Sequence, residues 1–215
     1  MPATRIKLCG FTRVDDVCTA IDAGADAIGL VFFASSKRNV SIEQAKALAA
    51  VVPPFVPLVG LFVDADPEFV ETVLSQVPLS LLQFHGKESA GYCESFHRPY
   101  IKAVRFRAEK SESGEQSNSQ ALQKAMREHR QASGFLIDTY HPELAGGSGE
   151  TFNWSELGST TDKPIILAGG LTTKNVGAAI TQVRPYAVDV SSGIEKSPGI
   201  KSASLIREFI QAVAR

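Results

Sequence analysis

The sequence predicts an α/β fold, a single-domain (β/α)8 barrel of the TIM type that spans residues 1–215. Three observations predict it. Short apolar runs alternate with segments of helical period, and most runs are continuously apolar, as strands covered on both faces should be. Eight such repeats over this length give about 27 residues each, near the short end of the barrel range. The alternative, an open doubly wound sheet, usually needs fewer strands and a G-x-G-x-x-G turn that the first repeat lacks.

The expected strands are short β-branched or apolar runs that pair in parallel through right-handed crossovers. Their carboxyl ends would then lie at one face of the barrel, where active sites of such barrels are built. We expect strands at Arg5–Cys9, Ala27–Phe33, Pro57–Val63, Leu79–Phe84, Tyr100–Val104, Phe135–Asp138, Pro164–Ala168 and Tyr186–Val190.

The first two helices begin at recognisable N-terminal signals. Thr12 with Asp15 resembles a capping box, and Gly24 is placed to end the helix that follows. Ser41 with Gln44 repeats the pattern before the second helix. Each helix should therefore start directly after the loop that leaves the preceding strand.

The remaining intervals vary in clarity. Asp66-Pro67 is an N-cap followed by proline at the first helical position, and Trp154–Gly158 is expected to hold only a turn or two of helix. Ala108–Gln120 is polar without an apolar period and predicts a solvated extension between the fifth strand and its helix. The clearest buried stripes are Val14, Val17, Cys18 and Ile21; Ile42, Ala45, Leu48 and Ala49; Phe69, Val70, Val73 and Leu74; and Leu205, Ile206, Phe209, Ile210 and Val213.

Composition favours a small-molecule partner. Lys+Arg total 22 against Asp+Glu 23, a formal net charge of -1, which gives no electrostatic reason to expect nucleic acid or an anionic membrane. The polar N-terminus has no apolar signal core, and Pro53, Pro54 and Pro57 interrupt the longest uncharged stretch, so we expect no membrane segment. The oligomeric state is not decided by the sequence, with a monomer slightly favoured.

The cysteines favour a reducing compartment. Cys9, Cys18 and Cys93 are odd in number and show no C-x-x-C spacing, so a disulfide framework or a structural zinc site is not expected. We therefore expect a cytoplasmic protein. Cys18 on its helix stripe and Cys93 are interpreted as packing residues.

Residues at the expected strand ends are the candidates for chemistry. Because side chains alternate along a strand, Lys7 and Cys9 share one face, inside the barrel or at its mouth. A nearby ammonium favours the thiolate, the form that acts as base or nucleophile, although a small buried apolar Cys9 remains an equal alternative from position alone. The strand ends carry Cys9, Arg38, His85, Arg105, Asp138, Gly169-Gly170 and Ser191-Ser192-Gly193.

Asp138 is a candidate acid. It follows Phe135-Leu136-Ile137 directly, so its carboxyl group lies at the edge of an apolar layer that favours the neutral, proton-donating form. A helix or loop cap is the alternative. The segment that follows, Ala145–Gly149, is glycine-rich and more typical of a closing loop than of a cap, which favours a functional role.

The last two strand ends predict an anion cradle. Gly169-Gly170 and Ser192-Gly193 allow backbone N–H groups to approach a ligand, and the segment after Pro198-Gly199 is a candidate for an extra helix N-terminus. Phosphate binding after strands seven and eight recurs in these barrels. Arg38 is placed to clamp a carboxylate, although position alone favours a solvated surface arginine. The histidines, with His85 alone at a strand end, show no metal-ligand spacing, so no metal is expected.

These motifs together resemble the phosphoribosylanthranilate isomerase family of tryptophan biosynthesis. The resemblance covers nearly the whole chain, and its most specific parts are the initial LCG, the GGSG-x-x-F-x-W run and DVSSGIE. The matching segments, in order, are IKLCGFTR, ADAIGLVFFASSKRNVS, LVGLFVD, LLQFHG, IKAVR, FLIDTY, AGGSGETFNW, ILAGGLTTKNV and AVDVSSGIEKSPGIKS.

The resemblance implies a (β/α)8 barrel and an aldose–ketose isomerase that needs no cofactor. Its reaction would be an Amadori rearrangement of N-(5-phosphoribosyl)anthranilate to 1-(2-carboxyphenylamino)-1-deoxyribulose 5-phosphate. By matching motifs, Cys9 corresponds to the general base, Asp138 to the general acid and Arg38 to the residue that meets the anthranilate carboxylate. The resemblance also places Asp189 near the sugar and the phosphate on the backbone of Gly169, Gly170, Ser192 and Gly193.

Four positions depart from the family pattern, and two rival functions stay open. The family often has proline at Lys37, threonine at Ser148 and aspartate at Asn153 and Ser202, which affects loop stiffness and capping rather than the reaction. One rival is another phosphosugar isomerase or epimerase barrel. The other is a non-catalytic module that binds a phosphometabolite, which would explain the anion cradle but not a thiol and an acid at two strand ends.

Overall fold

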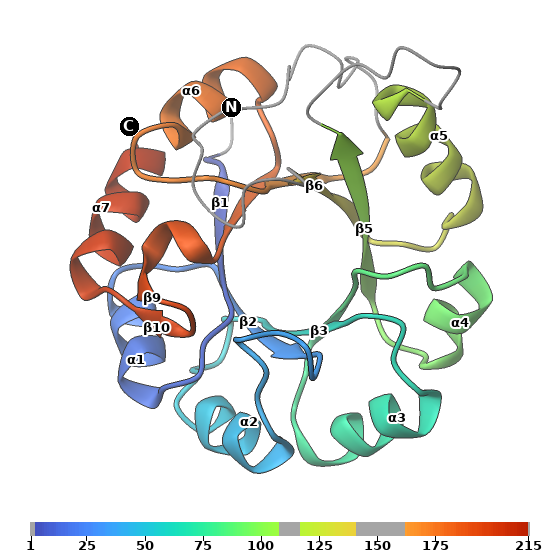
Figure 1. Cartoon of the computed structure of the whole chain (residues 1–215), viewed down its shortest axis with the longest axis horizontal. Coiled ribbons are helices and arrows are strands. Elements are labelled where there is room, and N and C mark those ends of the chain that lie inside the picture. Colours follow the sequence, from blue (N-terminus) through green and yellow to red (C-terminus); the bar gives the residue numbers. More distant parts are fainter. Residues whose placement is uncertain (1–2, 108–116, 141–161, 215) are drawn as a thin grey trace.

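The computed structural model describes residues 3–107, 117–140 and 162–214, and its centre is a closed barrel. Eight parallel strands follow one another around it in chain order, and β8 pairs with β1 to close the ring (Figure 1). The predicted barrel is therefore confirmed. The strands are β1 (Arg5–Cys9), β2 (Ala27–Phe32), β3 (Leu58–Phe62), β4 (Leu81–Phe84), β5 (Tyr100–Arg107), β6 (Gly134–Tyr140), β7 (Ile165–Ala168) and β8 (Ala187–Val190).

Three strands begin or end more than one residue away from the expected position, because backbone hydrogen bonds extend or shorten them. β5 and β6 run further than their apolar runs because they pair with each other as far as Arg107 and Tyr140. β4 begins at Leu81 rather than Leu79, since the Leu79 N–H donates to the Val77 carbonyl in a turn before the strand. The other ends shift by a single residue, so each predicted strand is found.

The helices of the described residues form a ring outside the strands (Figure 1). None of these helices is long and apolar enough to cross a membrane. They are α1 (Val14–Asp22), α2 (Ile42–Ala49), α3 (Pro67–Gln76), α4 (Ala90–Ser95), α5 (Asn118–Glu128), α6 (Val176–Val183) and α7 (Ala203–Val213).

Two of the three predicted helix starts are confirmed. The Ser41 hydroxyl accepts from the Gln44 N–H while the Gln44 side chain accepts from the Ser41 N–H, and Asp66 caps α3 ahead of Pro67. The Thr12 prediction is wrong. Helix α1 starts after Arg13 without a side-chain cap, because the Thr12 hydroxyl donates instead to the Gly199 carbonyl.

The polar extension predicted for Ala108–Gln120 is too long at its C-terminal end. Helix α5 begins at Asn118, where Ser117 and Gln120 form a capping box. A cap that needs only two polar residues three positions apart is easily missed inside a polar run. Residues 108–116 lie outside the described part of the chain.

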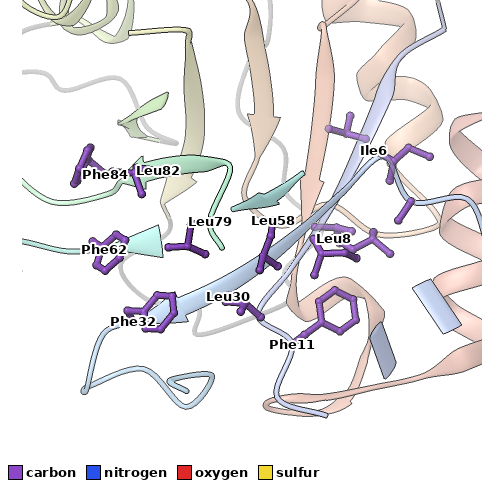
Figure 2. Packing of buried hydrophobic residues seen from close by; sticks show 14 of the residues in the cluster. Ile6, Leu8, Phe11, Leu30, Phe32, Leu58, Phe62, Leu79, Leu82 and Phe84 are labelled. Carbon is purple, nitrogen blue, oxygen red and sulfur yellow. The ribbon is translucent and has the colours of Figure 1, made fainter. Parts of the chain in front are cut away.

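Apolar residues form two layers on either side of the strands. The larger lies between strands and helices, and Figure 2 shows its side chains on β1 to β4, among them Leu8, Leu30 and Phe84. The smaller fills the barrel interior with the inward-facing residues Ile101, Ala103, Leu136, Ile166, Ala168 and Ala187. The predicted stripes are confirmed with one exception: Phe69 is 41% exposed at the edge of α3.

The chain after β8 departs from the expectation of an extra helix beyond Pro198-Gly199. The short extra helix is a 3-10 turn, η2 (Ser192–Ile194), directly after the strand. Pro198-Gly199 instead joins β9 (Glu195–Ser197) to β10 (Ile200–Lys201), an antiparallel hairpin drawn beside α1 and α7 in Figure 1. Ser202 caps α7, and its hydroxyl accepts from the Leu205 N–H.

Candidate active site

A thiol and a buried ion pair share the inner face of the seam between β1 and β8. Lys7 and Asp189 are register partners there, and Lys7 Nζ donates to Asp189 Oδ1 at 2.8 Å with both side chains buried. Cys9, two residues further along β1, points the same way and is 4% exposed. The predicted inward face of Lys7 and Cys9 is therefore confirmed. Asp189 also acts on the thiol, because its charge raises the pKa of Cys9.

Cys9 has room for its sulfur because the neighbouring strand carries a glycine at the same level. Gly29 is its register partner, and a Cβ on that glycine would lie 2.6 Å from Sγ. Burial raises the pKa of the Cys9 thiol, and Asp189 raises it further, against the opposing effect of Lys7 and Lys201. Lys7 thus favours the thiolate, as expected, but desolvation outweighs that attraction and the net pKa of Cys9 is raised.

The other two cysteines lie outside this site. Cys93 on α4 is buried among aromatic residues, as predicted, and its pKa is raised to about 12 mainly by burial. Cys18 on α1 is only partly buried. Neither is within the strand-end layer that holds Cys9.

Asp138 is joined to two further polar side chains at the carboxyl ends of β4 and β6. Its Oδ2 lies 3.0 Å from His85 Nε2, and His85 Nδ1 lies 3.0 Å from Gln83 Nε2. The carboxylate is 28% exposed, the imidazole 16% and Gln83 fully buried. The sequence placed His85 at a strand end without giving it a role, and Gln83 was not predicted. The alternation Leu82-Gln83-Phe84-His85 carried the signal, because two polar residues two apart point into the barrel together.

Arg38 is held in a buried ionic cluster rather than at the solvated surface that its position alone favoured. Its Nε and Nη2 donate to Glu195 at 2.8 and 2.6 Å, and the Arg38 side chain is 26% exposed. Lys201, fully buried, donates to the same carboxylate at 2.8 Å and to the Cys9 carbonyl at 2.6 Å. Glu195 and Lys201 were missed, since only the β9–β10 hairpin brings them to the barrel mouth.

The cluster leaves the site electrically positive. Burial raises the pKa of Glu195, but hydrogen bonds and charge from Arg38 and Lys201 outweigh burial, so its pKa lies below its ordinary value. Three cations, including Lys7 of the seam, therefore face two carboxylates, Glu195 and Asp189. An anionic ligand that contacts this cluster therefore meets a net positive charge, whereas the Asp138 carboxylate lies on β6, a strand that does not pair with β1 or β8.

Two glycine turns follow β7 and β8, where the anion cradle was predicted. Gly169 and Gly170 both have positive φ, at 82° and 64°. Gly193 packs so closely against the Leu171 carbonyl that a Cβ there would clash with it. Asn175 holds the first turn, since its Nδ2 donates to the Gly170 carbonyl at 3.0 Å. The two turns are thus in contact, and Ser192 begins η2 beside them.

Some sequence predictions lie outside the described residues. These are the glycine-rich segment Ala145–Gly149, the short helix expected at Trp154–Gly158, and the departures at Ser148 and Asn153. Within residues 3–107, 117–140 and 162–214, no group of three or more His, Cys, Asp or Glu is placed to hold a metal ion.

A closed eight-stranded parallel barrel with polar groups gathered at the carboxyl ends of its strands defines the class of TIM-barrel enzymes. The family follows from comparison with known proteins. The family model for N-(5'-phosphoribosyl)anthranilate isomerase matches residues 6–212, and the chain belongs to that family.

Close relatives share the full length of the chain. An N-(5'-phosphoribosyl)anthranilate isomerase of Pseudomonas fluorescens is 53% identical over 215 residues, which is 100% of this chain and 98% of the relative. The crystal structure of phosphoribosyl anthranilate isomerase from Thermotoga maritima is 40% identical, with a TM-score of 0.85 and 98% of each chain covered. A structure of such an isomerase in complex with reduced 1-(o-carboxyphenylamino)-1-deoxyribulose 5-phosphate is 34% identical, with a TM-score of 0.79 and the same coverage.

Proposed function

We propose that the chain converts N-(5'-phosphoribosyl)anthranilate into 1-(2-carboxyphenylamino)-1-deoxyribulose 5-phosphate, a cofactor-free Amadori rearrangement in tryptophan biosynthesis. Membership of the isomerase family supports the reaction. The observation that carries the mechanism is the pair of inward-facing groups at two strand ends, the Cys9 thiol on β1 and the Asp138 carboxyl on β6. These strands are not neighbours in the barrel, so the two groups approach a bound sugar from different sides.

Substrate binding would use the positive charge and the glycine turns. The backbone around Gly169-Gly170 and Ser192-Gly193 is proposed to hold the phosphate, supported by the left-handed turn and the close packing of Gly193 on Leu171. Arg38 is proposed to meet the anthranilate carboxylate. Its bidentate pair with Glu195 uses Nε and Nη2 and presents Nη1 to the ligand. The solved complex of a family member with a reduced product supports a ligand that carries both anionic groups.

The first chemical step is ring opening with Asp138 as the general acid. A proton passes from its carboxyl group to the furanose ring oxygen, the bond between that oxygen and C1 breaks, and the nitrogen lone pair forms a C1=N iminium. The ring oxygen becomes the C4 hydroxyl. His85, 3.0 Å from the carboxylate, orients the acid.

The second step is proton removal by Cys9. The iminium acidifies the hydrogen on C2, the Cys9 thiolate takes that proton, and the electron pair forms the C1=C2 bond while nitrogen regains its lone pair. The enolamine then becomes the ketone, C1 gaining a proton and the C2 hydroxyl losing one. Because burial raises the pKa of Cys9, its thiolate is a stronger base than an ordinary one, and the cationic iminium favours its formation.

The reaction is tested by following anthranilate fluorescence with purified protein. Turnover of N-(5'-phosphoribosyl)anthranilate should abolish the emission, whereas another phosphosugar isomerase or a binding module leaves it unchanged. Cys9→Ser and Asp138→Asn should keep the wild-type circular dichroism spectrum and lose ~10²–10⁴-fold in kcat, the usual effect of removing one acid or base. Near-wild-type turnover by either variant would overturn the assigned role.

The oligomeric state and the cellular compartment are also proposals. A monomer is proposed, as the sequence slightly favours. The Thermotoga maritima relative is described as dimeric, with monomers generated from it, so sedimentation velocity at assay concentration is the deciding measurement. A cytoplasmic location is supported by the need to keep the Cys9 thiol reduced.

A further inference from the structure

Gln83 contains a buried polar atom that the mechanism above leaves unexplained. Its side chain is fully buried on the inner face of β4, and its Oε1 has no hydrogen-bond partner within the described residues. No other buried side-chain nitrogen or oxygen of that part of the chain is left unpaired. Leaving such an acceptor unpaired is unfavourable, so a second arrangement that satisfies it is expected.

The observed contacts of Gln83 specify one tautomer of His85. An amide nitrogen donates and does not accept, so Gln83 Nε2, at 3.0 Å, requires an unprotonated Nδ1 on His85. The imidazole proton then lies on Nε2 and is donated to Asp138 Oδ2 at 3.0 Å. This arrangement fits the carboxylate form of Asp138, the form that exists after the acid has given up its proton.

A half-turn of the Gln83 amide fits the other form. Oε1 then takes the place of Nε2 and accepts the hydrogen bond from His85 Nδ1, while the amide nitrogen moves to the position that Oε1 held. With its proton on Nδ1, the imidazole accepts at Nε2 from a protonated Asp138, or carries a second proton as imidazolium beside the carboxylate. Each orientation of the amide thus matches one protonation state of the His85–Asp138 pair.

We propose that Gln83 is a positioning residue that sets the tautomer of His85 and, through it, the protonation of the acid Asp138. The inference rests on the proposed function, because it assigns Gln83 a role in supplying the proton for ring opening. Gln83 contacts His85, and its own side chain is fully buried. Loss of the Gln83 amide should therefore change which atoms of His85 and Asp138 carry protons. It should leave the binding of the phosphosugar unchanged.

The charged groups around the pair stay constant when Gln83 is changed. Lys102 on β5 and Glu88 after β4 pair with each other at 2.9 Å, and the Asp64 carboxylate accepts from the Lys87 N–H at 2.6 Å. Arg105, the register partner of Asp138 on β5, is exposed. A difference between the wild type and a Gln83 variant therefore reports on the amide and not on these charges.

The direct test is the 15N spectrum of His85 in protein labelled at histidine, with a His85→Asn sample for assignment. The neutral imidazole of the wild type should show a protonated Nε2 and an unprotonated Nδ1. Gln83→Met, similar in volume without hydrogen bonds, should show a mixture of tautomers. Leu81→Met, on the same face of β4, is the matched control and should keep the wild-type spectrum. A wild-type protein with the proton on Nδ1, or a Gln83→Met spectrum unchanged from wild type, overturns the proposal.

Kinetics separate a positioning role from a structural one. Gln83→Met should keep KM, lower kcat by less than the ~10²–10⁴-fold expected for loss of the acid itself, and displace the limb of the kcat–pH profile on which the proton-donating acid is lost. Gln83→Glu, whose carboxylate only accepts, should favour the proton on Nδ1 and displace the same limb in the same direction as Gln83→Met, and further. An altered KM with an unmoved pH profile contradicts the proposal. If the wild type leaves the anthranilate emission unchanged while the tautomer changes as expected, the proposed function fails and the assignment of Gln83 to His85 stands.

Discussion

Lys7 Nζ and Asp189 Oδ1 lie 2.8 Å apart across the seam that closes the barrel, and both side chains are buried next to Cys9. The two ends of this pair act on the thiol in opposite senses. Lys7 stabilises the thiolate and lowers the pKa of Cys9, whereas Asp189 destabilises it and raises that pKa. Burial lowers the pKa of Lys7, but Asp189 and Cys9 outweigh burial and raise it, so the ammonium stays charged.

Changing either partner should move the titration of Cys9 in a known direction. Asp189→Asn removes a negative charge and should lower the pKa of the thiol, while Lys7→Met removes the positive charge and should raise it. The measurement is the ultraviolet absorbance of the thiolate against pH, with the matching Cys9→Ser double variant subtracted to remove Cys18 and Cys93. Shifts in the same direction for both variants would contradict the opposed roles of the pair.

The pH dependence of turnover should reflect a buried base. Because burial raises the pKa of Cys9, kcat/KM is expected to keep rising with pH beyond ~8.5, the ordinary thiol value. Cys9→Asp replaces the base with one that ionises near pH ~4, so its rising limb should appear at much lower pH with a smaller maximum. A wild-type rate that levels off well below pH ~8.5 would show that a group other than the free thiol limits the reaction.

The glycine opposite Cys9 is expected to matter for activity. Gly29→Ala places a methyl group 2.6 Å from the present Sγ position, so the thiol must move. A displaced base should lower kcat by up to the ~10²–10⁴-fold given by its removal. Gly91→Ala on α4 is the control, since nothing lies within 4 Å of the added methyl group and alanine favours a helix. Equal kcat for the two variants would show that the thiol tolerates displacement.

The barrel and the two proposed reacting groups could be predicted from local patterns. Apolar runs located every strand of the barrel, although not β9 and β10, and the alternation of side chains placed Lys7 and Cys9 inside. The same alternation would have placed Gln83 and His85 inside had it been applied to β4. The histidines were considered only as metal ligands, so a histidine that is hydrogen-bonded to a carboxylate was not predicted.

Tertiary contacts explain what the sequence alone could not predict. Thr12 carries a capping pattern like that of Ser41, yet its hydroxyl donates to Gly199, which is 187 positions away. Arg38 and Glu195 are separated by 157 positions and meet only because β8 closes the barrel and the next hairpin folds over its mouth. The sign of the Cys9 shift depends on how deeply the thiol is buried, which no spacing of residues reports.

The carboxylate of Glu195 should contribute strongly to stability, since it neutralises two cations at once. Its side chain is 4% exposed, that of Lys201 is 0% exposed, and Arg38 adds a bidentate pair. Removing one partner of a buried pair leaves an uncompensated charge and typically costs about 3–5 kcal/mol. Glu43→Gln is the matched control, because its pair with Lys46 is exposed and such pairs contribute about 0–1 kcal/mol.

We therefore expect Glu195→Gln to lower the free energy of unfolding by about 3–5 kcal/mol at neutral pH, measured by urea denaturation. The pKa of Glu195 is lowered in the folded protein, so its contribution is complete above the ordinary glutamate value of ~4.3 and is lost as pH falls through the folded value. The gap between wild type and Glu195→Gln should accordingly close in acid, because a protonated glutamate resembles glutamine. A gap no larger than that of Glu43→Gln, or one that widens in acid, would mean that the hairpin holds Arg38 and Lys201 without help from this charge.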